Sequence, residues 1–544
     1  MKNMQPIFIL PENTEKIEGK NVQKNNILIA QEVANAVRST LGPKGMDSMI
    51  VNNLGDITIT NDGVTILNEM QVEHPVAKLL VEIARMQENS VGDGTTTTIL
   101  IASEILKKSE ELIKNGLHPT FITKGLHIAE QFVQEKLIEI AKDVSLEDYD
   151  ILKKIASTAI TGKGAENNNE IISNICVEAI NSVSDYKNGK TFINLDNIKI
   201  ESKEGESISK SRLVKGIILG KEKVHSSMPE RIDNAKILLL SCPLEVKKTI
   251  FDSHIEIKDP YDIDKYLEQE ERMIQEKVKG IKDVGANVVF CDQNIDDSSI
   301  NFFVQEGIFA VKRVKKEDME MLSKATKAKI LSNTKNIKET DIGKAGSVCE
   351  EIVNKEHLIF VENCTNPKSV TLFVRAITKH LAEELKRSIT DALGDLATAL
   401  NDGKVVTGAG STEMRLSIEL LNYAETIISK EQYILKAFAE ALEIIPKTLA
   451  ENAGLDSLEI LTKLRNKHKK EKCWFGVNVF DGVIQDALEM GVIEPLRTKS
   501  KAISSAGEVS EMILRIDNVI IGNPKQSQKQ SPYDQVPQQF SNYM

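Results

Sequence analysis

The chain contains 544 residues, of which 41% are hydrophobic, 27% charged and only 4% aromatic. Its 69 Lys and Arg residues and 80 Asp and Glu residues give a net charge of −11 at pH 7. This length predicts about three domains, and the composition excludes a chain that is disordered throughout. An acidic chain repels phosphates and few aromatic side chains are available for base stacking, so nucleic acid is not an expected partner.

The spacing of the cysteines bears on the redox compartment, and the hydropathy of the chain bears on membrane insertion and secretion. The six cysteines are scattered and form no CxxC pair, which argues against a zinc site and favours the cytosol. The apolar run Ile7–Leu10 is too short for a signal peptide, and no stretch approaches the ~18 apolar residues of a membrane helix. We therefore expect a cytoplasmic protein with no membrane partner.

Residues 20–145 are predicted to be rich in helices. Apolar residues recur with helical spacing over Asn26–Val37, and the pattern stops at Leu41-Gly42-Pro43, because Gly and Pro break helices. A second helix is predicted over Thr95–Asn115, with Gly116 as its C-terminal stop.

Residues 215–370 have a different pattern, in which short β-like runs alternate with helical segments. The predicted strands are Ala235–Leu240, Asn287–Cys291, Ile308–Val311, Ala328–Leu331 and His357–Val361. This alternation predicts an α/β unit. The highly charged segment Glu245–Val278 is expected to project from that unit as an insertion.

The helical pattern returns after about residue 370. A helix is predicted over Thr371–Leu400, with an interruption at Asn401-Asp402-Gly403, and the folded part is expected to end with Val492–Ile521. Residues 522–544 contain six Gln together with Pro, Ser and Asn, and are predicted to be a disordered tail. Because both ends are helical, we expect them to form one discontinuous body into which the middle is inserted.

The strongest candidate for chemistry is the segment Val91-Gly92-Asp93-Gly94 followed by four Thr residues and a predicted helix. The glycines permit close approach of a ligand, and a helix N-terminus attracts an anion. Asp93 is a suitable oxygen ligand for the Mg²⁺ that accompanies phosphates. The alternative is that Asp or Thr only caps the helix. The spacing of a Walker A motif is absent.

Weaker candidates lie elsewhere, and each has a structural alternative. They are the Gly turns Leu41–Gly45, Asn61–Gly63, Thr161–Gly164 and Gly408–Ser411, and the acid Asp391 on a predicted helix. Each turn could simply end or begin an element, and Asp391 could be a solvent-facing helical acid. The eight His residues show no HExxH spacing and no Ser lies in a GxSxG elbow, so zinc catalysis and hydrolase triads are unsupported.

Together these segments resemble group II chaperonin subunits, and among those the archaeal thermosome subunits most closely. The resemblance extends in order over about residues 5–521. Its motifs are LGPKGMD (41–47), ITNDGVTIL (59–67), EHPVAK (73–78), VGDGTTT (91–97), TGKGAE (161–166), RSITDAL (387–393), LAENAGLD (449–456) and the run from Gly491 to Ile520.

The resemblance implies a multidomain α and α/β fold. A mainly helical, discontinuous equatorial ATP-binding domain would comprise residues 1–147 and 404–521. An intermediate hinge domain would comprise 148–215 and 370–403, and an α/β apical substrate-binding domain 216–369, with a helical protrusion at about 245–278.

The resemblance also implies the site. Asp93 matches the Mg²⁺ ligand, and Asp62 and Asp391 match the catalytic acids that position and activate the attacking water. The remaining matches contact the nucleotide, Lys163 through the γ-phosphate and Glu494 near the ribose. They are Leu41, Gly42, Pro43, Gly94, Thr95, Thr96, Thr97, Lys163, Gly410, Phe480, Asp481 and Glu494.

The implied function is that of an ATP-dependent chaperone, with ATP and Mg²⁺ as cofactors. Copies or paralogous subunits would form two rings of eight or nine, and hydrolysis would close a built-in lid over a non-native client protein. The alternatives are a holdase or structural ring subunit with little turnover, and an unsupported small-molecule phosphotransferase. The chain departs from the family at Gly408-Ala409-Gly410 and Arg375-Ala376-Ile377, and in its Gln-rich tail.

Overall fold

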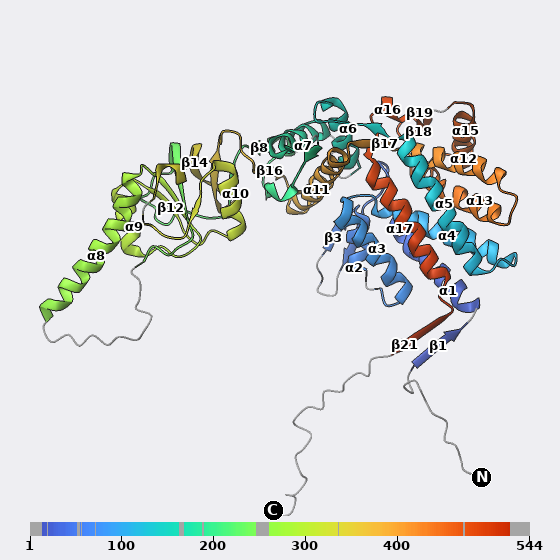
Figure 1. The fold of residues 1–544 in the computed structure, drawn as a ribbon, viewed down its shortest axis with the longest axis horizontal. Helices are drawn as coiled ribbons and strands as arrows, with labels where there is room; N and C mark the ends of the chain where they lie inside the picture. Colours follow the sequence, from blue (N-terminus) through green and yellow to red (C-terminus); the bar gives the residue numbers. More distant parts are fainter. Residues whose placement is uncertain are drawn as a thin grey trace, which may run out of the picture.

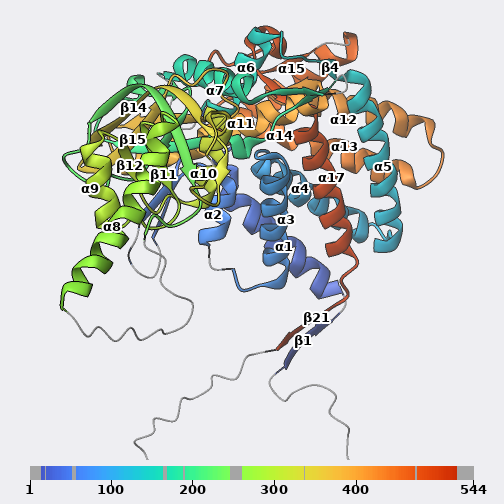
Figure 2. The same cartoon turned by 60° about the vertical axis from the view of Figure 1, so that its left-hand side comes forward.

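The computed structural model describes residues 14–18, 20–51, 55, 57–70, 72–162, 168–187, 190–245, 260–335, 337–471 and 474–522. Figure 1 shows an elongated molecule in which both chain ends contribute to one helical body and the middle of the chain forms a sheet-containing body at the other end. A third set of helices and strands lies between them, and Figure 2 shows the same arrangement from another side.

The helical body has one continuous hydrophobic core built from both chain ends. Its helices are α1 (Lys20–Arg38), α2 (Gly63–Glu69), α3 (Pro75–Val91), α4 (Thr95–Lys114), α5 (Pro119–Ile140), α12 (Ser411–Thr426), α13 (Glu431–Leu442), α14 (Ile444–Asn452), α15 (Ser457–Lys470), α16 (Ala487–Met490) and α17 (Leu496–Leu514). Helix α4 packs against α1, α3, α13 and α17. Ile99, Leu100 and Ile101 are consecutive and fully buried, because partners cover α4 on several faces.

The middle core joins helices to a small sheet. Its helices are α6 (Tyr149–Ile160), α7 (Asn169–Val183) and α11 (Lys379–Asp402), and its strands are β7 (Ile198–Glu204), β8 (Arg212–Val214) and β16 (Val370–Ala376). Strand β16 lies centrally, parallel to β7 and antiparallel to β8. The prediction of a helix from Thr371 was wrong over 371–376, because this run is buried on both sides and so lacks any distinguishing period.

The third body is a seven-stranded sheet in the order β12-β11-β10-β14-β15-β9, with β13 also paired to β10. The strands are β9 (Ile217–Leu219), β10 (Arg231–Leu240), β11 (Val288–Cys291), β12 (Phe309–Val311), β13 (Ile330–Leu331), β14 (Gly343–Val353) and β15 (Glu356–Glu362). Helices α8 (Pro260–Asp283) and α9 (Asp297–Gln305) share one core, and α10 (Lys316–Thr326) contributes to the core on the opposite face.

Every predicted strand of this unit coincides with an observed strand, although β13 is only two residues long. The sequence did not reveal β14, whose two glycines and exposed charged residues weaken the strand pattern. Helix α8 begins within the predicted insertion, continues past its predicted end at Val278 to Asp283, and extends away from the sheet in Figure 1. Residues 246–259 of that insertion lie outside the described residues.

Short strand pairs complete the fold. They are β1 (Thr14–Glu18) with β21 (Asn518–Gly522), β2 (Ser48–Val51) with β3 (Ile57–Thr60), β5 (Asp185–Lys187) with β6 (Lys190–Phe192), β18 (Phe475–Asn478) with β19 (Val483–Asp486), and β17 (Lys404–Thr407) with β20 (Ile493–Pro495) and β4 (Lys142–Asp143). The β1–β21 pair joins the two chain ends below α1 and α17 (Figure 1). The predicted tail beyond residue 522 lies outside the described residues, and none of the described helices could cross a membrane.

The contact between α5 and α13 supplies a test of how tightly the two chain ends pack. A methyl group on Gly125 would lie 2.8 Å from Cβ of Ile434 and 2.5 Å from its Cδ1. Overpacking typically costs about 1–3 kcal/mol, whereas Ala stabilises a helix by about 1 kcal/mol relative to Gly. We expect Gly125→Ala to lower the thermal unfolding midpoint, measured by scanning calorimetry.

Gly280 of α8 is the matched control, because a methyl group there would meet no atom of the described residues within 4 Å. Gly280→Ala is expected to leave the midpoint unchanged or raise it slightly. A rise with Gly125→Ala as large as with Gly280→Ala would contradict the close α5–α13 contact.

Candidate functional site

A cavity of about 580 Å³ lies where the helical body meets the middle core. Its size suits a small-molecule ligand. Most of the residues predicted from the resemblance line it, namely Leu41, Gly42, Pro43, Asp62, Asp93, Gly94, Thr95, Thr96, Thr97, Gly410, Phe480, Asp481 and Glu494. The structure therefore brings together segments that are more than 300 residues apart in the sequence.

The loop before α4 presents backbone donors to this cavity. Gly94 has φ +85° and occupies the N-cap position, and within the described part of the chain no side chain caps the helix. The alternative in which Asp93 or a Thr side chain only caps α4 is therefore not observed. The free N–H groups and partial positive charge of this end favour an anion, and the Thr95, Thr96 and Thr97 side chains add hydroxyl donors.

A buried glutamine fixes the loop from behind. Nε2 of Gln87 donates to the carbonyl of Asp93 at 2.9 Å and to the carbonyl of Thr498 at 3.4 Å. A Cβ on Gly94 would lie 3.1 Å from Gln87 Nε2 and 3.1 Å from Thr498 Cγ2. Glycine is needed there both for its positive φ and for this close approach. The loop is thus held against the start of α17.

Asp62 has two roles in the structure. It caps α2, because its carboxylate accepts from Thr65 N at 2.8 Å, from Thr65 Oγ1 at 2.6 Å and from Val64 N at 3.4 Å. It also lines the cavity, and its neighbour Gly63 lies against Thr96 of α4, because a Cβ on Gly63 would be 2.4 Å from Thr96 Oγ1. Asn61–Gly63 is therefore both a turn that begins a helix and a part of the candidate site.

The turn Leu41–Pro43 forms another wall of the cavity. Nδ2 of Asn452 donates to the Leu41 carbonyl at 2.9 Å and to the Arg38 carbonyl at 3.0 Å, which attaches this turn to α14. Thr161 also lines the cavity, at the end of α6. Lys163, two residues further along the chain, lies outside the described residues.

The β18–β19 hairpin provides an aromatic rim. Oδ1 of Asn478 accepts from the backbone N of Phe480 at 3.0 Å and of Asp481 at 3.2 Å, and Nδ2 of Asn478 donates to Asp481 Oδ2 at 2.8 Å. Phe480 is 61% exposed, with Lys44 Nζ 5.2 Å from the centroid of its ring. An exposed ring held at a cavity mouth is a suitable face for a planar ligand group.

The electrostatics of the cavity are acidic. Asp62, Asp93, Asp481 and Glu494 line it, and Lys499 is the one Lys or Arg among the described lining residues. Burial raises the pKa of Glu494, Lys499 opposes this shift, and Glu413 and Asp93 add to it. Lys499, Gln87 and Asn478 were missed by the sequence analysis, because single polar residues on helices and hairpins carry no motif of their own.

Asp391 is not among the residues that line the cavity. It lies on α11, is 7% exposed, and belongs to the middle core rather than to the helical body. Helix α11 nevertheless touches the α4 loop one turn later, since a Cβ on Gly394 would lie 3.2 Å from the Val91 carbonyl oxygen. The catalytic role of Asp391 stays a prediction.

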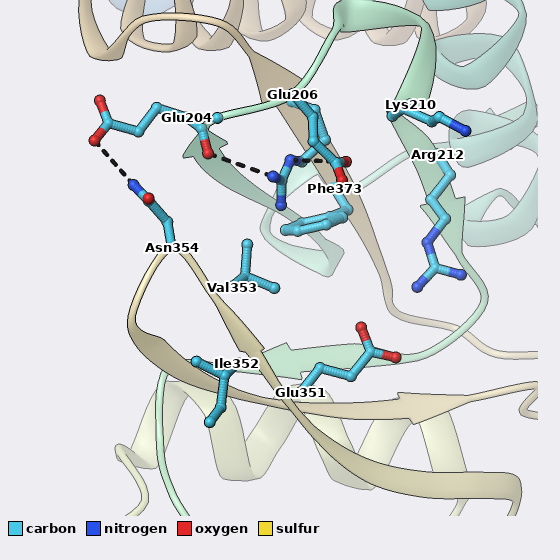
Figure 3. A pocket seen from close by; sticks show the side chains of 11 residues that line it. Glu204, Glu206, Lys210, Arg212, Glu351, Ile352, Val353, Asn354 and Phe373 are labelled. Atoms are coloured by element: carbon cyan, nitrogen blue, oxygen red, sulfur yellow. Dashed lines mark hydrogen bonds and ion pairs between the residues drawn. The ribbon is translucent and has the colours of Figure 1, made fainter.

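A second cavity, of about 510 Å³, lies where the β7–β16–β8 sheet meets the turn between β14 and β15 (Figure 3). Nη2 of the buried Arg375 donates to the Glu204 carbonyl at 3.3 Å, and Nδ2 of Asn354 donates to Glu204 Oε1 at 2.9 Å. Ala376 pairs with Glu204 in regular strand geometry, so this departure from the family pattern demands no glycine conformation. None of the described predicted site residues lines this cavity.

The sequence profile of the TCP-1/cpn60 chaperonin family matches residues 33–524. A thermosome subunit of Methanothermococcus thermolithotrophicus is 50% identical over 517 residues, 95% of this chain and 94% of that protein. A thermosome subunit of Pyrococcus horikoshii is 48% identical over 537 residues, 99% and 98% of the two chains. Thermosome subunit beta of Methanothermobacter thermautotrophicus is 50% identical over 529 residues, 97% of each chain.

Ala409 provides a test of backbone strain in the cavity wall. Its φ is +55°, a left-handed conformation that costs an L-residue about 1–2 kcal/mol. Glycine removes this strain, although it loses about 0.4–1 kcal/mol through the entropy of the unfolded chain. We expect Ala409→Gly to raise the free energy of unfolding by about 0.5–1 kcal/mol, measured as a higher calorimetric midpoint.

The control is Ala453→Gly, because Ala453 has φ −83° and glycine relieves no strain there. That variant is expected to lower the midpoint. If Ala409→Gly lowers it to the same extent, the left-handed conformation of Ala409 is not costly.

Proposed function

The chain belongs to the TCP-1/cpn60 chaperonin family, which confirms the predicted resemblance, and we propose that it is an ATP-dependent molecular chaperone. The observation that carries this proposal is the cavity built on the uncapped N-terminus of α4. It combines donors for phosphate, acids for a metal ion, and an aromatic rim. No observation favours the alternative holdase or structural subunit.

The composition of the cavity fits a nucleotide bound with Mg²⁺. A phosphate chain would lie against the Gly94–Thr97 segment, which lines the cavity and offers backbone N–H groups at the start of α4 and three Thr hydroxyls. Asp93 would hold Mg²⁺, which would neutralise phosphate charge that the acidic lining cannot compensate. Glu494 would accept a hydrogen bond from the ribose, and Phe480 and Asp481 would contact the adenine.

Hydrolysis requires an oriented water as well as charge neutralisation. Asp62 lines the cavity and is fixed by its own hydrogen bonds to Thr65, so it is suited to position that water. We propose that Asp391 completes the site when α11 shifts along its contact with the α4 loop, and that Lys163 senses the γ-phosphate. Turnover would then depend on the position of the middle core.

The three cores correspond to three proposed domains. The helical body would be the equatorial ATPase domain, the middle core the intermediate domain, and the seven-stranded sheet the apical domain that contacts non-native client proteins. Helix α8 would contribute to a built-in lid. We propose that copies or paralogous subunits assemble into two rings of eight or nine, and that the protein functions in the reducing cytoplasm, which suits its scattered cysteines.

The catalytic proposal is tested by Asp391→Asn, a nearly isosteric change. We expect Mg²⁺-dependent ATP hydrolysis by the assembled particle to fall at least ~100-fold, the usual contribution of an acid–base group, while ADP affinity stays unchanged. Glu383→Gln on the same helix is the control, because its carboxylate is half exposed and forms a surface ion pair with Lys379. Equal turnover in Asp391→Asn and the native particle would remove Asp391 from the mechanism.

Assembly is tested by the mass of the native particle in light scattering. Sixteen or eighteen copies of a 60.4 kDa chain give roughly 970–1,090 kDa. A single ring, or a monomer that still hydrolyses ATP, would contradict the double-ring proposal without affecting the assignment of the nucleotide site.

A further inference from the structure

Three charged side chains meet at the base of the nucleotide cavity. Nζ of Lys499 lies 2.6 Å from Glu413 Oε1 and 2.9 Å from Glu494 Oε2. They come from the start of α17, the first turn of α12, and strand β20. Lys499 thus bridges two segments of the C-terminal half that are about 80 residues apart in sequence.

Burial distinguishes the two carboxylates. The Glu413 side chain is completely buried, the Lys499 side chain is 5% exposed and the Glu494 side chain is 18% exposed. Glu494 lines the cavity whereas Glu413 does not. Although burial acts to lower it, the attraction of Glu413 and Glu494 raises the pKa of Lys499, so the ammonium stays charged. Removing one partner of such a buried set leaves an uncompensated charge.

The surroundings leave Glu494 little freedom on its other side. A Cβ on Gly408 would lie 2.3 Å from Glu494 Oε1, so the carboxylate packs directly against the backbone of the 408–410 turn. One oxygen therefore faces this turn, and the other is held by Lys499. The orientation of the carboxylate is fixed by the cation and the turn together.

We propose that Lys499 is a positioning residue that holds the Glu494 carboxylate toward the ribose hydroxyls of the bound nucleotide. The proposal rests on the proposed nucleotide site. Lys499 does not act on phosphate, because both carboxylates already engage its ammonium. On the buried side, the Glu413 carboxylate forms the second ion pair of the Lys499 ammonium and so anchors Lys499 in place.

The experiment separates positioning from folding. Lys499→Met leaves Glu413 buried without its cation, so this variant is paired with the double variant Lys499→Met/Glu413→Gln, which removes that charge as well. Calorimetric titration of the assembled full-length particle with ADP, 2′-deoxy-ADP and 3′-deoxy-ADP measures the contribution of each ribose hydroxyl.

The native particle is expected to bind ADP at least about 10-fold more tightly than one of the deoxynucleotides, as for a hydrogen bond to a charged group. The double variant is expected to recover the thermal midpoint lost in Lys499→Met and still to bind ADP and that deoxynucleotide equally. Glu494→Gln should likewise abolish the preference for ADP over that deoxynucleotide. The triple variant Glu494→Gln/Lys499→Met/Glu413→Gln should bind the two nucleotides no differently from Glu494→Gln alone.

A double variant that keeps the native discrimination would overturn the proposal and leave Lys499 a purely structural role. A native particle that binds ADP but does not discriminate would overturn it too, while the nucleotide site stands. Only a native particle that binds none of the three nucleotides would contradict the proposed function itself.

Discussion

The packing of α4 between α1 and α17 is the contact on which the cavity depends. Helix α4 begins directly after the Val91–Gly94 loop, and the packing of its buried face fixes the direction of the N–H groups at its N-terminus. The α17 side of the contact brings the C-terminal half to the same place, because Thr498 touches both Gln87 and Gly94. The packing of apolar helix faces, which involves no directional bonds, therefore sets the geometry of a polar site.

Among the described residues, the cavity holds acidic side chains and almost no available positive charge. The cavity is acidic, and its one described cation is already engaged by two carboxylates. Binding of a phosphate compound at such a site depends on backbone donors and on a metal ion rather than on basic side chains. The remaining predicted acid, Asp391, lies on a helix of a different core, so under the proposed mechanism the complete site would depend on the relative position of two bodies.

Sequence predicted the parts of this protein that carry local signals. The GDGTT loop, the breaks at Gly42 and Gly116, and the alternation of strands and helices in the middle follow from turn chemistry and periodicity. The family resemblance located Asp62, Gly410 and Glu494 in one cavity, which no periodicity could do. The start of α11 was misplaced because a strand buried on both sides resembles a buried helix, and Lys499 was missed because its partners are distant in sequence.

The nested order of the three cores has a consequence for biosynthesis. The buried residues of the first core run up to Leu137 and then resume at Val406, so its N-terminal helices lack their C-terminal partners while the intervening chain is made. At a synthesis rate of about 5–20 residues per second, this interval lasts roughly 15–50 s. During that time α1 and α4 can pack against each other, but the faces of α4 that contact α13 and α17 stay exposed on the ribosome. The sheet of residues 217–362, by contrast, has all its strands before the chain reaches Val406. The body that emerges first is therefore among the last to be completed.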